Sequence, residues 1–142
     1  FRIANACQRV SDLGAVYIEG RDSESECQVF DCGIYHTHPA GYTLWNGRAD
    51  YVNAGIHVDD GARAVISNCT ITDCEVGILI NGHYDGLVSD VTITECDIRN
   101  CKIPVMVIGS PNVDNPVIIR TDLPENRIFV KAGWVSVVES PC

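Results

Sequence analysis

Cysteines separated by four residues recur in this sequence, and their spacing could serve metal binding, disulfide formation or core packing. The three pairs are Cys27 with Cys32, Cys69 with Cys74, and Cys96 with Cys101. A structural zinc site also needs a second cysteine knuckle on a compact loop, and cysteines on rigid strands seldom converge tetrahedrally. Zinc is therefore disfavoured at these pairs. Two alternatives stay open: free thiols that pack as small buried hydrophobes, and disulfides, which depend on the directions of the side chains.

Three of the four histidines could form a metal site. His-x-His on a strand places two imidazoles on one side, so His36 and His38 could bind Zn²⁺ with His57 as the third ligand. The alternative is that these histidines lie in a loop and on the surface, where they pack against aromatic rings.

Aromatic rings and hydrogen-bonding side chains form a second group of candidates. Sugar rings have apolar C–H faces and hydroxyl rims, and side chains of these two kinds suit both. The predicted ligand-binding residues are Tyr35, Tyr42, Trp45, Arg48, Asp50, Tyr51, His57, His83, Tyr84 and Asp85. The competing interpretation is that the aromatic side chains only pack a loop onto its scaffold. The sequence leaves both interpretations open.

Two adjacent carboxylates, Asp59 and Asp60, are candidates for acid–base catalysis. Glycoside hydrolysis uses two carboxylates that face each other across the scissile bond. Adjacent residues on a strand face opposite ways, although in a turn both could be exposed. The sequence has no nucleophile-elbow, phosphate-loop or dinucleotide-binding motif. Whether the protein is an enzyme therefore stays undecided.

These side chains must be positioned by a repeat. Residues 75–82, which follow Cys74, match residues 102–109, which follow Cys101, position by position. Each repeat unit has about 20 to 27 residues, and alternating apolar residues within it predict three short strands. No segment has the apolar stripe of an amphipathic helix. The repeat therefore predicts an all-β solenoid.

The coils of this solenoid should stack in register. A bend at Ser67-Asn68 recurs at Thr94-Glu95, so the corner occupies the same place in two units. Stacking predicts two cysteine columns that project into the core. The first column is Cys27, Cys69 and Cys96, and the second is Cys32, Cys74 and Cys101. Cys7 could begin the second column one coil earlier, and Cys142, at the chain end, could join another molecule head to tail.

His57 should point away from the core. It alternates with the inward residues Ile56 and Val58, so its side chain should face solvent or lie beneath a loop. The turn after Ile80 should lie near the turn after Val58 in the stacked coils, so His83 could share a face with His57.

Residues 55–58 (Gly-Ile-His-Val) and residues 66–71 (Ile-Ser-Asn-Cys-Thr-Ile) carry a family resemblance. This pattern resembles the right-handed parallel β-helix of the pectate-lyase-like superfamily, and the similarity extends over residues 14–109. The resemblance implies a right-handed solenoid, which we expect to have about four to five coils. The family includes polysaccharide lyases, glycoside hydrolases, phage tailspikes and adhesins, so the resemblance implies a fold rather than one activity.

The resemblance also bears on catalysis. The lyase branch uses an Arg or Lys base, commonly with acidic Ca²⁺ ligands, which would make Arg48 or Arg63 a candidate base and Ca²⁺ a candidate cofactor. The hydrolase motifs of the fold, Asn-Thr-Asp and Gly-His-Gly, do not occur.

Two segments break the repeat within an otherwise single domain, residues 1–142. Residues 33–53 are predicted to be an insertion loop, and long loops on rigid scaffolds often carry function. Residues 127–142 are predicted to form a hairpin that caps the solenoid. Because the chain begins at Phe1, we expect either a processed mature protein or a piece of a longer one.

The composition limits the partners. The formal net charge of -9 argues against nucleic acid and disfavours anionic glycans unless a cation bridges them. The apolar runs are too short for a membrane span. Eight cysteines and one Met are more typical of a secreted or surface protein, although buried free thiols also fit. We therefore expect an extracellular, cell-surface or virion-surface protein that binds glycan, and it could be part of a polysaccharide-degrading protein. The alternative is a subunit of a filament or fibre that self-assembles through the solenoid ends.

Overall fold

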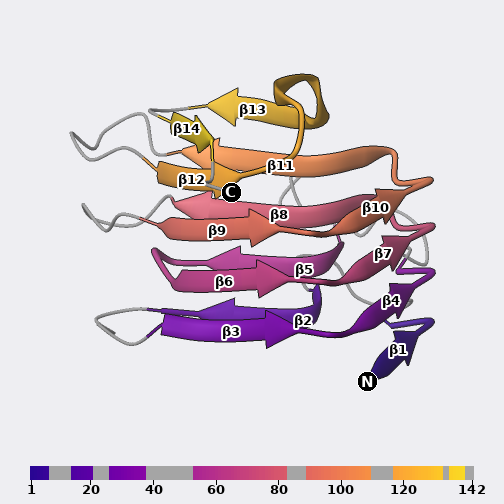
Figure 1. Ribbon diagram of the computed structural model, residues 1–142. Coiled ribbons are helices and arrows are strands. Elements are labelled where there is room, and N and C mark those ends of the chain that lie inside the picture. Colours follow the sequence, from indigo (N-terminus) through magenta and orange to yellow (C-terminus); the bar gives the residue numbers. More distant parts are fainter. Residues whose placement is uncertain are drawn as a thin grey trace, which may run out of the picture.

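The computed structural model is an all-β solenoid (Figure 1). It describes residues 1–6, 14–20, 26–37, 53–82, 89–109, 117–132 and 135–139. Fourteen strands form three sheets in which every pair of neighbours is parallel. A short 3₁₀ helix, η1 (Glu125–Arg127), is the only helix in this part of the chain. The predicted parallel β-helix is therefore confirmed.

The chain visits the three sheets in the same order in each coil. Sheet A holds β1 (Arg2–Ala4), β4 (Gly33–Tyr35), β7 (Thr70–Thr72) and β10 (Asp97–Arg99). Sheet B holds β2 (Gly14–Glu19), β5 (Ala54–Asp59), β8 (Val76–Gly82), β11 (Ile103–Gly109) and β13 (Ile128–Ala132). Sheet C holds β3 (Glu26–Phe30), β6 (Arg63–Ser67), β9 (Asp90–Thr94), β12 (Val117–Thr121) and β14 (Val135–Glu139). Four of the five coils thus contribute a strand to each sheet, and in the last coil η1 stands between β12 and β13.

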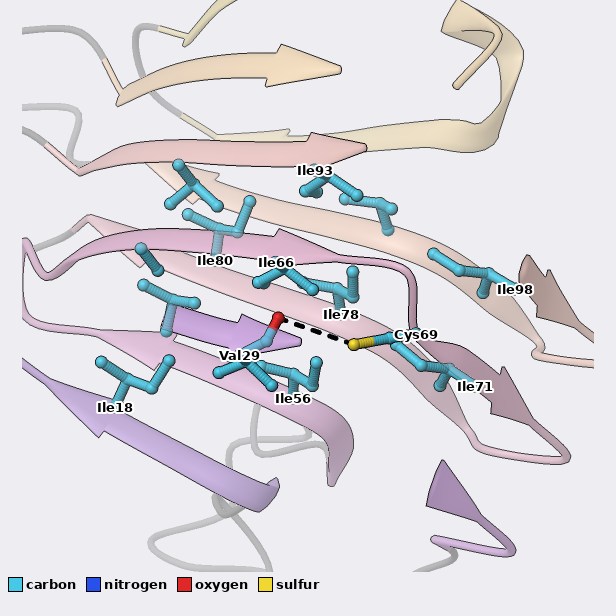
Figure 2. Close-up of a cluster of buried hydrophobic side chains, with 14 of the residues drawn as sticks. Ile18, Val29, Ile56, Ile66, Cys69, Ile71, Ile78, Ile80, Ile93 and Ile98 are labelled. Atoms are coloured by element: carbon cyan, nitrogen blue, oxygen red, sulfur yellow. Dashed lines mark hydrogen bonds between the residues drawn. The ribbon is translucent and has the colours of Figure 1, made fainter. Parts of the chain in front are cut away.

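Stacked aliphatic side chains fill the interior (Figure 2). In sheet A, Ile34, Ile71 and Ile98 are paired in register and buried. Sheets B and C contribute similar columns through strands whose alternate side chains point inward. Full burial of one such side chain contributes about 1.5–3 kcal/mol, so the columns are the main source of stability.

Residues in the left-handed region form the corners. Asp31, Asn68 and Glu95, which lie between a sheet C strand and a sheet A strand, have φ of 52°, 49° and 54°. Asp and Asn tolerate this conformation better than most residues because their short polar side chains bond locally. Asp73 and Asn100, which precede the second cysteine of the other two pairs, have φ of 56° and 52°, so the same preference explains why Asp or Asn stands before the second cysteine of each pair.

Backbone hydrogen bonds join each corner to the next coil. The N–H of Asn68 donates to the carbonyl of Thr94 at 3.1 Å, and the N–H of Asp73 donates to the carbonyl of Arg99 at 3.2 Å. The side chain of Asn68 also donates to Asp31 Oδ1 at 2.6 Å. Hydrogen bonds along the solenoid axis therefore hold the corners of successive coils together.

The predicted cysteine columns were wrong in one respect. Cys32 precedes β4 as Cys69 precedes β7 and Cys96 precedes β10, so these three form one column. Cys27 lies instead on β3, is exposed, and pairs with Ala64 of β6. The error arose because the same four-residue spacing spans β3 in one pair and a sheet A strand in the other two.

The boundaries of the two unusual segments also differ from the prediction. Residues 33–35 form β4, so the repeat continues past Gly33 and the predicted insertion began too early. The predicted C-terminal hairpin was wrong, because β13 pairs with β11 and β14 pairs with β12, in parallel and in different sheets. Two apolar runs joined by a short link look alike in sequence whether they form a hairpin or the next coil.

Candidate functional site

The outward face of sheet B contains the hydrogen-bonded cluster that we consider the candidate site. His57 lies on β5 between the inward residues Ile56 and Val58 and therefore points outward. It is nevertheless 0% exposed, as is most of β5, whose six residues are all buried. Both faces of this strand are thus removed from solvent, which excludes the solvent-facing alternative for His57.

Asp59 is the centre of this cluster. The Tyr17 hydroxyl donates a hydrogen bond to Asp59 Oδ2, and the Asn81 amide donates to Asp59 Oδ1 at 2.9 Å. The backbone N–H of Asp60 also donates to Oδ1 at 2.9 Å. His57 Nε2 lies 3.9 Å from Asp59 Oδ2. We call Tyr17, His57, Asp59 and Asn81 the Asp59 cluster.

The ring of Tyr17 is held in place by two contacts. It packs edge-on against the His57 imidazole, with ring centroids 4.9 Å apart and an interplanar angle of 76°. Its hydroxyl is fixed by Asp59. Asp59 is only 6% exposed, whereas Tyr17 is 40% exposed. The carboxylate therefore acts as an internal support, and the tyrosine is the part of the cluster that a ligand can reach.

The chemistry of the cluster follows from these donors and acceptors. Because the Tyr17 hydroxyl uses its one donor hydrogen in the bond to Asp59, it can meet a ligand only as a hydrogen-bond acceptor. Both oxygens of Asp59 already accept hydrogen bonds. The cluster therefore presents a rigid aromatic ring with a polar tip.

The structure brings together some of the predicted site residues and separates others. His57, Asp59 and Asp60 are neighbours, but Asp60 is also buried, and its φ is 50° in the turn after β5. Asp59 and Asp60 therefore do not form an exposed carboxylate pair. His36 is exposed at the corner after β4.

Tyr35 belongs to a different sheet from the Asp59 cluster. It lies on β4 of sheet A, where the Arg2 guanidinium sits 4.4 Å from the centre of its ring. Several other predicted residues lie outside the described residues: His38, Tyr42, Trp45, Arg48, Asp50, Tyr51, His83, Tyr84 and Asp85. Within the described ranges, no group of three or more His, Cys, Asp or Glu side chains could hold a metal ion. The described residues therefore offer no set of ligands for the predicted Zn²⁺ or Ca²⁺.

Sequence reasoning missed Tyr17 and Asn81. Both occupy outward positions of aligned repeats: Tyr17 pairs with His57, and Asn81 bonds to Asp59 from the next coil. The signal was present in the alignment of residues 14–19, 54–59 and 76–81, whose outward positions could have been compared one by one.

The six described cysteines are free thiols. Four of them donate to the carbonyl two residues earlier: Cys69 to Ser67 at 3.2 Å, Cys74 to Thr72 at 3.3 Å, Cys96 to Thr94 at 3.3 Å and Cys101 to Arg99 at 3.4 Å. Cys32 Sγ and Cys69 Sγ are 3.1 Å apart without a covalent bond. Cys7 and Cys142 lie outside the described residues.

Burial and thiol–thiol contacts shift the pKa values of these cysteines. Burial, together with the neighbouring Cys69 thiol, raises the pKa of Cys32 to about 12. Burial raises the pKa of Cys96 to about 11. The hydrogen bond between Cys74 and Cys101 lowers the pKa of Cys74 and raises that of Cys101, because the two share one proton. The thiols of Cys32, Cys96 and Cys101 therefore stay protonated and unreactive at neutral pH, whereas the pKa of Cys74 is lowered to about 6, which favours its thiolate there.

Comparison with known proteins agrees with this architecture. A family model described as the right-handed beta helix region matches residues 14–122. No curated protein and no solved structure matched the chain. None of the described segments is a helix long and apolar enough to cross a membrane.

Proposed function

Because this chain belongs to the right-handed β-helix family, we propose that it is an extracellular or surface protein that binds a glycan on the outward face of sheet B. The fold is one that surface and polysaccharide-acting proteins use. The observation that carries the proposal is Tyr17, an exposed ring fixed by His57 and Asp59. A flat apolar face beside a hydrogen-bonding tip suits a sugar ring.

Preorganisation favours this function over simple surface packing. A tyrosine that is already held in one orientation loses little side-chain freedom when a ligand binds. Asp59 receives four contacts that fix its position, although it is too buried to meet a ligand itself. This arrangement supports binding rather than acid–base catalysis by Asp59, so we propose no reaction for it.

The test is to remove the ring and measure glycan binding. Tyr17→Ala should weaken binding of a responsive oligosaccharide about tenfold or more, because an aromatic contact contributes about 1 kcal/mol beyond its buried area. Phe30→Ala is the matched control, since Phe30 is also an exposed aromatic of the first coil but lies on sheet C. Isothermal titration calorimetry against neutral and charged oligosaccharides reports both affinities. Equal losses in the two variants, or no binding by the parent protein, would contradict the proposal.

Self-assembly is a second candidate, favoured by where apolar side chains are exposed. Every exposed large apolar side chain among the described residues lies in the first or the last coil. These residues are Phe1, Tyr17, Phe30, Phe129, Val130 and Val138. The outermost strands of sheets B and C are β2 and β3 at one end and β13 and β14 at the other. Stacking β13 and β14 of one copy against β2 and β3 of the next would pair these edges and cover the apolar residues.

Sedimentation over a range of protein concentrations tests the assembly. Phe129→Lys should abolish concentration-dependent polymers, whereas Thr92→Lys, in the middle of sheet C, should leave them unchanged. A parent protein that stays monomeric at all concentrations would refute this candidate.

A further inference from the structure

Two buried thiols of successive coils lie in contact. Cys32 Sγ donates to Cys69 Sγ at 3.1 Å, and the two residues are 4% and 1% exposed. Cys69 points into the interior, where its thiol also lies 3.6 Å from the carbonyl oxygen of Val29 (Figure 2). This contact lies at the corner between sheets C and A, whereas the Asp59 cluster lies on sheet B.

The backbone holds these two cysteines at a separation that suits a disulfide. The N–H of Thr70 donates to the carbonyl of Cys32 at 2.9 Å, and Gly33 pairs in register with Thr70. Neighbouring strands of a sheet are about 4.8 Å apart, and disulfides join residues whose Cα atoms are about 4.4–6.8 Å apart. The sulfur atoms have only to move from 3.1 Å to the separation of about 2.05 Å in a disulfide.

Cys96, the next member of the same column, is held differently. Its thiol donates to the carbonyls of Ile66 and Thr94, at 3.6 and 3.3 Å. The thiol of Cys32, in contrast, donates directly to the sulfur of Cys69. The contacts therefore select Cys32 as the partner of Cys69.

We propose that Cys32 and Cys69 form a disulfide when the chain folds in the presence of a small-molecule disulfide such as oxidised glutathione. The thiolate of one cysteine attacks the oxidant and displaces one glutathione thiolate, which leaves a mixed disulfide. The thiolate of the other cysteine then attacks the protein sulfur of the mixed disulfide and displaces the second glutathione. The two cysteines lose two electrons and two protons in total, and the two glutathione thiols that are formed take them up.

The oxidant has to react before the coils have packed, because both thiols are buried in the folded chain. After packing, the same burial protects the bond from reductants. The bond does not require that the protein bind glycan, and an extracellular location would supply oxidising conditions.

The bond would close one complete coil into a covalent loop. Residues 32–69 contain β4, β5 and β6, which are one strand of each sheet. Closing a loop restricts the unfolded chain more than the folded one, and a disulfide typically raises the folding equilibrium constant about a hundredfold.

The test is to refold reduced, urea-unfolded protein in a mixture of reduced and oxidised glutathione and then to block the remaining thiols with N-ethylmaleimide. Cleavage before aspartate places each cysteine on its own peptide, with Cys32 in residues 31–49 and Cys69 in residues 60–72. Mass spectrometry without reduction should find these two peptides linked. A link from Cys69 to Cys96 instead, or blocked thiols at both Cys32 and Cys69, would overturn the proposal.

Urea unfolding measures what the bond does to stability. The folding equilibrium constant of the oxidised parent protein should exceed that of the reduced parent about a hundredfold. Cys32→Ala should remove the difference between oxidised and reduced protein, whereas Cys27→Ala, which changes an exposed cysteine on β3, should retain it. Equal stability of the oxidised and reduced parent would overturn the stabilising role. A difference that Cys27→Ala removes would overturn the assignment to Cys32 and Cys69.

Discussion

Replacing Asp59 with leucine should destabilise the protein far more than replacing it with asparagine. Leucine leaves the Asn81 amide and the Asp60 N–H without their acceptor. Each buried donor that loses its partner costs about 1–3 kcal/mol. Tyr17 is 40% exposed, so water can satisfy its hydroxyl. Burial of the leucine offsets about 1–2 kcal/mol of the cost of about 2–6 kcal/mol for the two donors, so the net loss is about 1–4 kcal/mol.

Asparagine keeps one oxygen for the Asn81 amide and the Asp60 N–H. Its amide nitrogen then faces the Tyr17 oxygen, which can accept instead of donating. The change replaces hydrogen bonds to a charged acceptor by neutral ones, at a cost of about 1 kcal/mol. The expected order of stability is therefore parent, Asp59→Asn, Asp59→Leu.

Urea unfolding followed by circular dichroism measures these differences, with an unchanged m-value as the sign that the unfolded state is the same. Asp97→Leu is the control, because Asp97 is an exposed residue whose partner, Arg99, is also exposed. Its effect should stay within about 0.5 kcal/mol. If Asp59→Leu is no more destabilising than Asp97→Leu, the hydrogen bonds of the Asp59 cluster do not stabilise the fold and the reasoning fails.

Three further predictions concern the scaffold. Ile71→Ala should lower the free energy of unfolding by about 2–5 kcal/mol, because it opens a cavity in the middle of a fully buried column; denaturant titration would contradict this by showing a loss below 1 kcal/mol. Asn68→Ala should lower the free energy of unfolding by about 1–2 kcal/mol, because φ is 49° at this position. Asn68→Gly should lower it less, because glycine adopts this φ without strain. Equal effects of the two variants in the same titration would refute the backbone explanation. The free energy of unfolding should fall as pH rises from 9 toward 12, since the pKa of Cys32 is raised from 9.0 to about 12 and the unfolded chain loses its proton first. Cys32→Ala should reduce that slope without abolishing it, because the pKa values of Cys96 and Cys101 are raised as well; an unchanged slope would exclude the assignment.

The fold could be predicted because the residues that build it repeat. The inward isoleucines and the Asp or Asn at most corners obey local rules of alternation and backbone conformation, so one coil predicts the next. The position of Cys27 could not be predicted, because a four-residue spacing does not say which strand it spans. The strand that contains Cys27 is known only from the pairing of β3 with β6 in the structure.

The candidate site was only partly predictable. His57 and Asp59 stood out by residue type, but Tyr17 lies a coil earlier in the chain, 42 residues from Asp59. Contacts between coils depend on the length of the segment that connects them, which the repeat does not determine. The loop that was expected to carry function, residues 33–53, lies outside the described residues from 38 to 52, so its predicted ligand-binding role stays a prediction.

The hydrogen bonds at the corners have a consequence for how such a protein changes in length. The corners donate toward the following coil, as Asp31 does to Ser67, Asn68 to Thr94 and Asp73 to Arg99. An interior coil therefore receives from the coil before it the same bonds that it gives to the coil after it. A duplication or deletion of one whole coil restores these backbone bonds at the new junction, whereas a change of a few residues inside a coil does not. The coil is accordingly the unit in which this chain can grow or shorten during evolution.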